Sequence, residues 1–174
     1  REIVVLSDAN TYYFPDAIRK LARHFANPDV GVVTGDVRLL RSEQKFGQGE
    51  SLYYKYERKL QELETSFWAT VGIDGAMYAI RRPLWQHSRS TMAADDLVTG
   101  MAVGRQGYRI IYDPEAIAEE DPTPTDGMEF RRKIRIITHS VQGMLEGEGV
   151  PRLTQGKFLW TYLSHKVLRW SVGL

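Results

Sequence analysis

Oxygen-bearing side chains follow directly after a short apolar run near the start of the sequence. Residues 3–6 are apolar and mostly β-branched, and the polar segment 7–11 comes next. This pattern predicts a buried strand that ends in a polar turn. Asp8 and Asn10 lie two residues apart in that turn, so both can offer oxygen atoms to one hard divalent cation that neutralises a diphosphate. The alternative is that they only form a turn or cap the next helix.

A pair of adjacent carboxylates, Asp95 and Asp96, forms a second candidate site. The residues around it predict a helix that begins at this pair and ends at Gly107. The pair can serve simply as an N-cap and a first-turn acid, because the positive end of a helix stabilises negative charge. A carboxylate on so rigid a mount can also act as the general base that deprotonates an attacking sugar hydroxyl.

A glycine-rich segment, residues 72–76, precedes a predicted strand that Pro83 ends. Small residues such as Gly75 and Ala76 let a chain-like acceptor come close to the backbone. Arg81 follows, and an arginine can pair with phosphate or stack against a ring. Taken alone, the pattern more often means a tight turn followed by surface arginines.

Positive charge gathers toward the C-terminal end. Residues 129–135 form a cationic cluster on a predicted helix, and this cluster includes Arg132 and Arg135. Such a cluster suits a diphosphate released in a reaction. A solvated basic face is the commoner explanation.

The last residues predict a basic amphipathic helix. Its apolar positions recur every three or four residues, and no acidic residue follows Glu148. Such a helix can lie in the headgroup region of an anionic membrane, or it can dock its apolar side on the sheet of its own domain. No run of about 18 apolar residues occurs, so we expect no complete transmembrane helix in the sequence. The apolar positions are Leu159, Leu163, Val167, Trp170 and Leu174.

The composition is that of an ordinary globular domain. Of 174 residues, 43% are hydrophobic and 26% are charged, which excludes disorder and coiled coil. There is no cysteine, so disulfides, zinc–thiolate sites and a cysteine nucleophile are excluded. The net charge of +1 argues against a nucleic-acid partner. The four histidines are scattered without metal-ligand spacing, so we assign them no role.

Strand and helix patterns alternate along the chain. This alternation favours a mixed, mainly parallel sheet covered by helices, with ligands at the carboxyl ends of its strands. Residues 108–112 read as an edge or final strand. The predicted strands are residues 3–6, residues 30–35 leading on to 37–40, the later part of segment 71–82, and residues 108–112. The predicted helices are residues 15–25, 50–67 and 95–106.

In combination, the order and spacing of these motifs resemble the family 2 inverting glycosyltransferases of the GT-A fold, most closely the bacterial membrane-associated members. The resemblance covers nearly the whole sequence, and it implies an α/β GT-A-like domain. Its most specific part is the Asp-Asp-Leu helix followed by Gly-Tyr-Arg and Pro-Glu-Ala. The segments that carry it are residues 7–11, 33–35, 72–82, 94–97, 107–116 and 129–135.

The resemblance implies roles for the two acidic motifs. Asp8 and Asn10 fall on the Asp-x-Asp element that holds Mg²⁺ or Mn²⁺ and the nucleoside diphosphate of the donor. Asn10 departs from that element, because it replaces the second carboxylate with a neutral oxygen donor. Asp96 falls on the expected general base, and Asp95 stands where the family usually has Glu.

The resemblance also implies roles for the basic and small residues. Gly75 and Ala76 match the acceptor-side segment, with Arg81 close behind. Arg132 and Arg135 lie where processive synthases carry Gln-x-x-Arg-Trp, and they would steady the leaving group. Arg132 replaces the Gln and Ile136 replaces the Trp, which argues against synthesis of a long polymer.

The implied activity is transfer of a sugar, with inversion, from a nucleoside-diphosphate sugar to a hydroxyl of a saccharide or lipid-linked acceptor. The nucleotide-gripping half of the family's domain would lie before Arg1. We therefore expect residues 1–121 to be a partial catalytic domain and residues 122–174 a basic helical region that leads toward a membrane. The implied location is the cytoplasmic face of a bacterial inner membrane.

Two alternatives remain open from the sequence. Residues 8–11 also resemble the nucleophile loop of haloacid-dehalogenase-like phosphatases, although Asn10 would then replace the general acid. The other alternative is a truncated, non-catalytic module that binds a saccharide or a partner.

Overall fold

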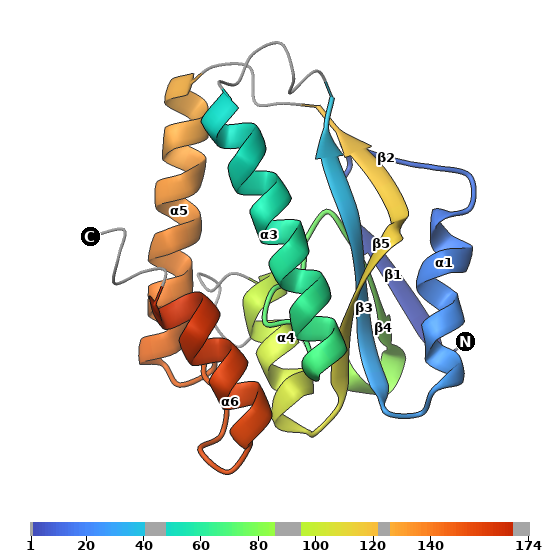
Figure 1. Ribbon diagram of the computed structural model, residues 1–174, viewed down its shortest axis with the longest axis vertical. Coiled ribbons are helices and arrows are strands. Elements are labelled where there is room, and N and C mark those ends of the chain that lie inside the picture. The colour runs from blue at the N-terminus through green and yellow to red at the C-terminus, as the bar shows by residue number, and fades with distance from the viewer. Residues whose placement is uncertain (1, 41–47, 86–94, 122–125, 169–174) are drawn as a thin grey trace.

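The computed structural model describes residues 2–40, 48–85, 95–121 and 126–168. These residues build one five-stranded sheet in the order β1-β4-β3-β5-β2, covered by helices on both faces (Figure 1). The strands are β1 (Ile3–Ser7), β2 (Thr11–Tyr13), β3 (Val30–Leu39), β4 (Met77–Arg81) and β5 (Arg109–Glu120). The helices are α1 (Ala17–Arg23), α3 (Gln48–Phe67), α4 (Asp95–Arg105), α5 (Asp126–Leu145) and α6 (Gly156–Tyr162), with 3₁₀ turns at His24–Ala26 and Arg82–Leu84 and a π-helical turn at Leu163–Val167.

The sheet is mixed, as expected, but its pairing is not mainly parallel. Within the described residues, only β3 and β5 pair in parallel. Strands β1, β3 and β5 do run in the same direction, as the β-α-β reading of the sequence requires. Strand β4 lies between β1 and β3 and runs against both, so it converts the expected parallel pairing into two antiparallel pairings. The hydropathy pattern of a strand does not specify which strands it pairs with. The position of β4 between β1 and β3 could therefore not be predicted from the sequence.

Strand β5 is longer than predicted, and it is internal rather than an edge. Asp113 pairs with Gly35 and Ile117 pairs with Asp36, so residues 114–116 form a bulge. A side chain at Gly35 would overlap the Met77 side chain and the carbonyl oxygen of Ala116, which explains a glycine there. The bulge interrupts the alternation of apolar and polar residues. The sequence prediction therefore ends at residue 112, although the strand continues to Glu120. The second half of β5 carries the short strand β2 at the edge of the sheet.

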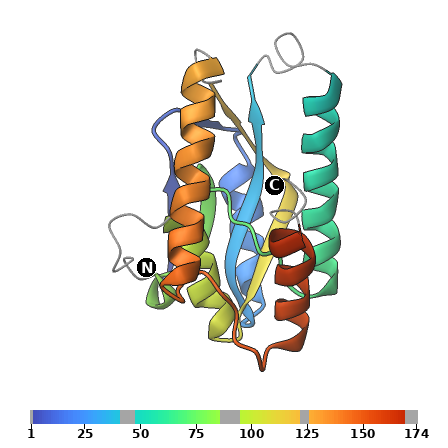
Figure 2. The ribbon, with the colours of Figure 1, turned by 90° about the vertical axis from the view of Figure 1, so that its left-hand side faces the viewer.

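Alternate strand residues bury their side chains on opposite faces. Val33 and Ile111 join the core beneath α1, whereas Val32 and Ile110 join a larger core on the other face. Figures 1 and 2 show α1 alone on the first face and α3, α4, α5 and α6 on the second. Because both faces are covered, the central strands are apolar on both sides, as in other helix-covered sheets.

The described part of the C-terminal helix docks on its own domain. Phe158 and Tyr162 are buried in the larger core, with exposures of 2% and 1%. The buried side of the helix therefore differs from the predicted apolar side, because Leu163, a predicted apolar position, is 45% exposed. Trp170 and Leu174 lie outside the described residues. Among the described helices, none combines the length and the apolar character that crossing a bilayer requires.

His165, to which the sequence analysis assigned no role, fixes this C-terminal segment to α3. Its Nδ1 lies 2.6 Å from Glu64 Oε1 and its Nε2 lies 2.9 Å from Glu57 Oε1. Burial lowers the pKa of His165, but the hydrogen bonds to Glu57 and Glu64 outweigh burial and leave the pKa raised. The two glutamates thus favour the imidazolium form, and the ion pairs join two helices more than 90 residues apart in sequence.

Candidate functional site

The pairing of β1 with β4 places Asp8 beside the glycine-rich loop. Ser7 pairs with Met77, so the residue after β1 meets the residue before β4. The backbone N–H of Asp8 donates to the carbonyl oxygen of Ala76 at 3.3 Å, while the Asp8 side chain is exposed. The predicted cation ligand and the predicted acceptor segment are therefore neighbours.

Hydrogen bonds hold the loop before β4 in one shape. The backbone N–H of Asp74 donates to Thr34 Oγ1 at 3.0 Å, and that hydroxyl donates to the carbonyl of Met77 at 3.1 Å. The N–H of Ala76 donates to Asp74 Oδ1 at 3.0 Å. Thr34 is fully buried on β3, so the central strand anchors the loop. The loop is a rigid part of the site.

Asp96, in the first turn of α4, lies against this loop. A Cβ added to Gly75 would be 3.6 Å from both the Cβ and Oδ2 of Asp96. Asp96 Oδ1 accepts the backbone N–H of the next residue, Leu97, at 2.7 Å. An N-cap side chain would bond an N–H two or three residues further on, so this contact is not a cap. Asp96 is instead an acid in the first turn of α4, where the helix dipole stabilises its charge, and such a position is compatible with a role as a base toward Gly75. Asp95 is the first residue of α4, and its side chain lies outside the described part.

The turn after β1 is tied to the end of β5. Thr11 pairs with Glu120 across the β2–β5 ladder. Asn10, just before β2, donates from its Nδ2 to Glu120 Oε1 at 3.0 Å. Both candidate cation ligands therefore have fixed neighbours, Asp8 through its backbone and Asn10 through its side chain.

The electrostatics of Asp74 link these parts. Part of the residue reaches the surface, but its carboxyl group is enclosed by protein, and this burial raises its pKa to about 6. The hydrogen bond from Ala76 lowers the pKa, whereas the charges of Glu120 and Asp96 raise it. Carboxylates from β5, α4 and the loop therefore act on one another at this end of the sheet.

The two arginines of α5 differ in their relation to the site. Arg132 is partly buried, and its charge lowers the pKa of Asp74, so it acts on the acidic group. Arg135, three residues on, is exposed. The predicted cationic helix is confirmed, and it extends far beyond the predicted residues 129–135.

The structure corrects the expectation for Arg81, which does not lie with Gly75 and Ala76. It ends β4, about 13 Å along the strand from Met77. Its guanidinium donates to the carbonyls of Val30, Phe25 and Asn27 at 2.8 to 3.0 Å and lies over the Phe25 ring. These bonds satisfy carbonyls between α1 and β3. The arginine is therefore a structural residue under α1.

Two residues of the site escaped the sequence analysis as functional residues. Asp74 lies in segment 72–76, which the sequence pattern predicts as a tight turn, and nothing in that pattern indicates that the carboxyl group is enclosed. Glu120 lies 110 residues from Asn10, and only the β2–β5 pairing brings them together. The predicted strand ends at residue 112, so the sequence pattern gives no signal for Glu120.

No group of three or more His, Cys, Asp or Glu residues is placed to hold a metal ion among the residues the structure describes. A hard cation of the magnesium type takes one or two protein oxygens and fills its remaining positions with water and phosphate. Asp8 and Asn10 offer such oxygens. Asp8 and Asn10 can thus hold a cation on a diphosphate, while Asp96 lies beside Gly75 of the glycine-rich loop.

Comparisons with known proteins bear on the family and the fold. A family model described as glycosyltransferase like family 2 matches residues 1–138. No curated protein matches the chain. Among solved structures, the chain is similar to the mannosyltransferase PcManGT from Pyrobaculum calidifontis in complex with GDP-Man and Mn²⁺, with 23% identity and a TM-score of 0.68. This similarity covers 95% of the chain but 46% of that structure, and at this identity it shows a shared GT-A-like fold.

Proposed function

Because this chain belongs to the glycosyltransferase like family 2, we propose that it transfers a sugar from a nucleoside-diphosphate sugar to a hydroxyl acceptor by a single displacement with inversion. The observation that carries the proposal is the approach of Asp96 to Gly75, next to the loop residue that binds the Asp8 backbone. This displacement needs a base and a cation ligand near one another, and Asp96 and Asp8 both lie beside this loop.

Asp96 is proposed as the general base. Its Oδ1 is held by the N–H of Leu97, and its Oδ2 faces Gly75. As the acceptor oxygen forms its bond to the anomeric carbon, the acceptor proton passes to Asp96 Oδ2. The bond from the anomeric carbon to the diphosphate oxygen breaks on the opposite side, and the diphosphate leaves with that electron pair.

Asp8 and the Oδ1 of Asn10 would hold Mg²⁺ or Mn²⁺, and the ion, when bound, offsets the charge of the leaving diphosphate. The similar mannosyltransferase was solved with Mn²⁺ and GDP-Man, which supports a metal and a nucleotide-sugar donor here. Arg132 and Arg135 on α5 would attract the same diphosphate. Asp95 would add negative charge beside the base.

The acceptor is proposed to lie along Gly75 and Ala76, where small residues leave the backbone approachable. A saccharide or a lipid-linked hydroxyl has the required nucleophile. The rigid loop would hold the acceptor oxygen at a fixed distance from Asp96, and such positioning lowers the barrier by removing translational freedom.

We also propose that α5 and α6 contact an anionic membrane, at the cytoplasmic face of a bacterial inner membrane. Figure 2 looks onto this side of the molecule. The exposed side chains of α5, of α6 and of the residues next to α6 combine large apolar groups with cations, which is the chemistry of an interfacial helix. They are Met128, Phe130, Ile134, Ile137, Val141, Leu145, Trp160 and Leu163, together with Arg131, Arg135, Arg152 and Lys157.

Sedimentation with phosphatidylglycerol vesicles tests the membrane contact. We expect Ile137→Glu to reduce binding of the full-length protein severalfold, because an acid would enter the apolar, anionic interface. Ile18→Glu is the matched control, since Ile18 is also exposed but lies on α1. Equal loss in both variants, or no binding by the wild type, would refute the membrane contact.

Asp96→Asn in the full-length protein tests the transferase proposal. We expect transfer from a panel of nucleotide sugars to fall about 10²- to 10⁴-fold, the range of general-base assistance, while donor affinity stays within about twofold. Asp29→Asn, at an exposed position on the far end of the sheet, is the control. Equal activity of the Asp96 variant would remove this residue from the mechanism. Turnover of a generic phosphate ester without sugar transfer would favour the phosphatase alternative, and absence of both activities the binding module.

A further inference from the structure

The turn that offers the cation ligands is linked to a carboxylate from a distant strand. Asn10 is exposed and precedes β2, and its amide nitrogen donates to Glu120 Oε1 at 3.0 Å. Glu120 is partly buried at the end of β5, where it pairs with Thr11. The bond therefore joins a residue of the proposed metal site to a side chain whose backbone is held in the sheet.

We infer that Glu120 is a positioning residue of the donor site: it orients the Asn10 amide so that Oδ1 is available to the cation, and it supplies beside residue 10 the negative charge that an asparagine lacks. The inference rests on the proposed function, because it assumes a cation at Asp8 and Asn10. It deepens that function by assigning a role to a residue outside the sequence motif.

The orientation follows from hydrogen-bonding capacity. A carboxylate oxygen only accepts hydrogen bonds, so the amide group that faces Glu120 must be the NH₂ donor. The Asn10 carbonyl oxygen is then directed away from Glu120. Without such a partner, an exposed amide group can rotate by about 180° and turn its NH₂ group toward the cation. The NH₂ group is a hydrogen-bond donor and cannot ligate a cation. Outer partners of this kind orient metal ligands generally, and their loss weakens metal affinity about 10- to 100-fold.

The charge argument is independent of the orientation. A turn with one carboxylate and one amide attracts a divalent cation less than a turn with two carboxylates. Glu120 returns a carboxylate to within one hydrogen bond of residue 10. Its charge also reaches Asp74, whose pKa it raises, so Glu120 acts on the interior of the site as well as on its rim.

A purely structural bond at the edge of the sheet would make a different prediction. In that case, removal of Glu120 would lower the melting temperature and leave the cation affinity of the folded protein unchanged. Direct titration of Mn²⁺ into the full-length protein with GDP, followed by electron paramagnetic resonance of free Mn²⁺, measures affinity without relying on sugar transfer. A thermal melt of each variant reports stability in parallel.

Three variants and one control separate the two roles. Glu120→Ala removes both orientation and charge, and we expect Mn²⁺ to bind about 10- to 100-fold more weakly. Glu120→Gln keeps an acceptor for the Asn10 amide but loses the charge, so its affinity should lie between those of the wild type and the alanine variant. Glu119→Gln removes the same charge from the neighbouring residue, whose side chain points to the opposite face of the strand, and should change Mn²⁺ affinity less than twofold.

The decisive variant exchanges the two groups. In the double variant Asn10→Asp with Glu120→Gln, the glutamine amide donates to the new carboxylate, so hydrogen bond and charge are both retained with donor and acceptor reversed. We expect Mn²⁺ affinity within about threefold of the wild type, or tighter, and this variant remains informative if Glu120→Ala does not fold.

The outcomes are distinguishable. Equal Mn²⁺ affinity in wild type, Glu120→Ala and Glu120→Gln would overturn the role of Glu120 and leave the transferase proposal standing, as would a double variant as weak as Glu120→Ala. No Mn²⁺ binding by a wild type that transfers sugar would also overturn it. The Asp96→Asn variant tests the transferase proposal independently, because its readout is the rate of sugar transfer and not the affinity for Mn²⁺.

Discussion

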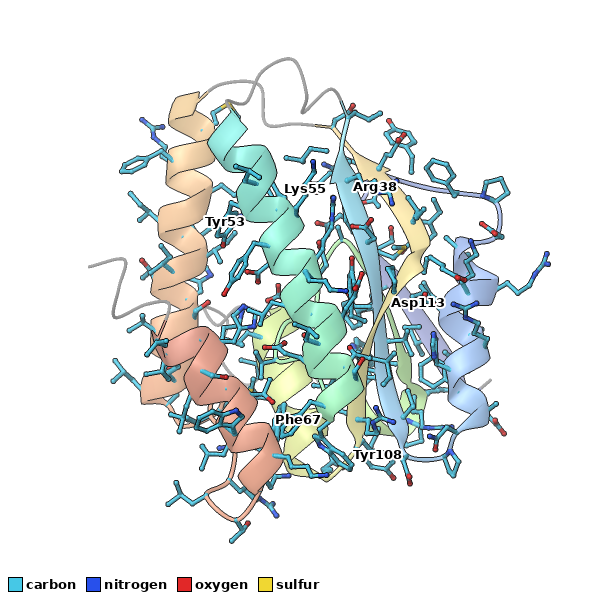
Figure 3. All side chains as sticks on the ribbon, in the orientation of Figure 1. Arg38, Tyr53, Lys55, Phe67, Tyr108 and Asp113 are labelled. Atoms are coloured by element: carbon cyan, nitrogen blue, oxygen red, sulfur yellow. The ribbon has the colours of Figure 1, made fainter. Side chains whose placement is uncertain are left out.

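Carboxylates have different surroundings beneath α1 and at the proposed site. Beneath α1, Asp113 is 2% exposed and accepts hydrogen bonds from Arg23 at 2.9 and 3.0 Å. His24 Nε2 lies 2.8 Å from the same carboxylate, and the N–H of Glu115 donates to it at 3.0 Å. Figure 3 shows Asp113 between β5 and α1. Burial raises the pKa of Asp113, but these partners outweigh burial and hold the pKa below its ordinary value.

At the proposed site, the balance is reversed. Asp74 is enclosed, it receives one hydrogen bond from Ala76, and the nearby carboxylates of Asp96 and Glu120 raise its pKa further. The charge of Arg132 only partly opposes them. The fold thus compensates Asp113 with cations under α1, whereas at the end of β1 it gathers carboxylates that carry a net negative charge.

The difference helps to separate structural acids from functional ones. A buried carboxylate with a lowered pKa and fixed cationic partners stabilises the fold, as Asp113 does. A buried carboxylate with a raised pKa among other acids reduces stability, and such arrangements are concentrated at functional sites because a cation or substrate can compensate them. Stability measurements can therefore test the assignment without knowledge of the substrate.

The largest effect on stability is expected for Asp113→Ala. It leaves Arg23, His24 and the N–H of Glu115 without their shared acceptor, and we expect a loss of about 3 kcal/mol in the free energy of unfolding. Urea denaturation at pH 7 measures it. Glu115→Gln is the control, because Glu115 pairs with Arg23 while 59% exposed and should cost less than about 1 kcal/mol. Equal losses in the two variants would break the comparison.

The contribution of Asp113 should depend on pH. Its pKa is lowered in the folded state, so the stabilisation is present above the ordinary pKa of 3.8 and is lost as pH falls through the folded-state value. The wild type and Asp113→Ala should therefore approach one another in stability as pH falls below 3.8.

Asp74→Asn should give the opposite pH dependence. The folded-state pKa is about 6 and the ordinary value is 3.8, so the folded wild type retains its proton longer and loses stability as pH rises between these values. The limiting slope is about 1.4 kcal/mol per pH unit for one proton. The asparagine keeps the acceptor for Ala76 but has no proton to lose, so the variant should lack this slope. Parallel curves for the two proteins from pH 4 to 7 would count against an uncompensated Asp74.

The smallest effect is expected for Arg81→Lys. The ammonium group keeps the charge but cannot reach the three carbonyls that the planar guanidinium binds, so we expect a loss of about 1 kcal/mol in stability. The Michaelis constant for the acceptor should stay within about twofold, because Arg81 lies under α1. A large rise in that constant with unchanged stability would return Arg81 to the acceptor site.

Much of the fold followed from local chemistry. The apolar run before Asp8, the amphipathic pattern of α3 and the paired acids that open α4 each predicted an element that the structure confirms, because spacing along the chain decides which face of an element is apolar. The order of the motifs along the chain also indicates the family, because that order does not depend on tertiary contacts. Asp8, Asn10 and Asp96 could be proposed because their residue types carry the chemistry.

The tertiary structure alone decided which of these groups meet. The insertion of β4 between β1 and β3 brings Gly75 and Ala76 to Asp8, the β2–β5 ladder brings Glu120 to Asn10, and neither pairing leaves a local periodicity in the sequence. The pairing of β4 with β1 also places Arg81 opposite Ile3, at the end of β4 that is far from the site. Residue type and spacing are properties of a short segment, whereas burial, pKa and the identity of a charged neighbour depend on strands that are distant along the chain. The sequence by itself therefore named most of the candidate groups, and the packing of the sheet decided which of them belong together.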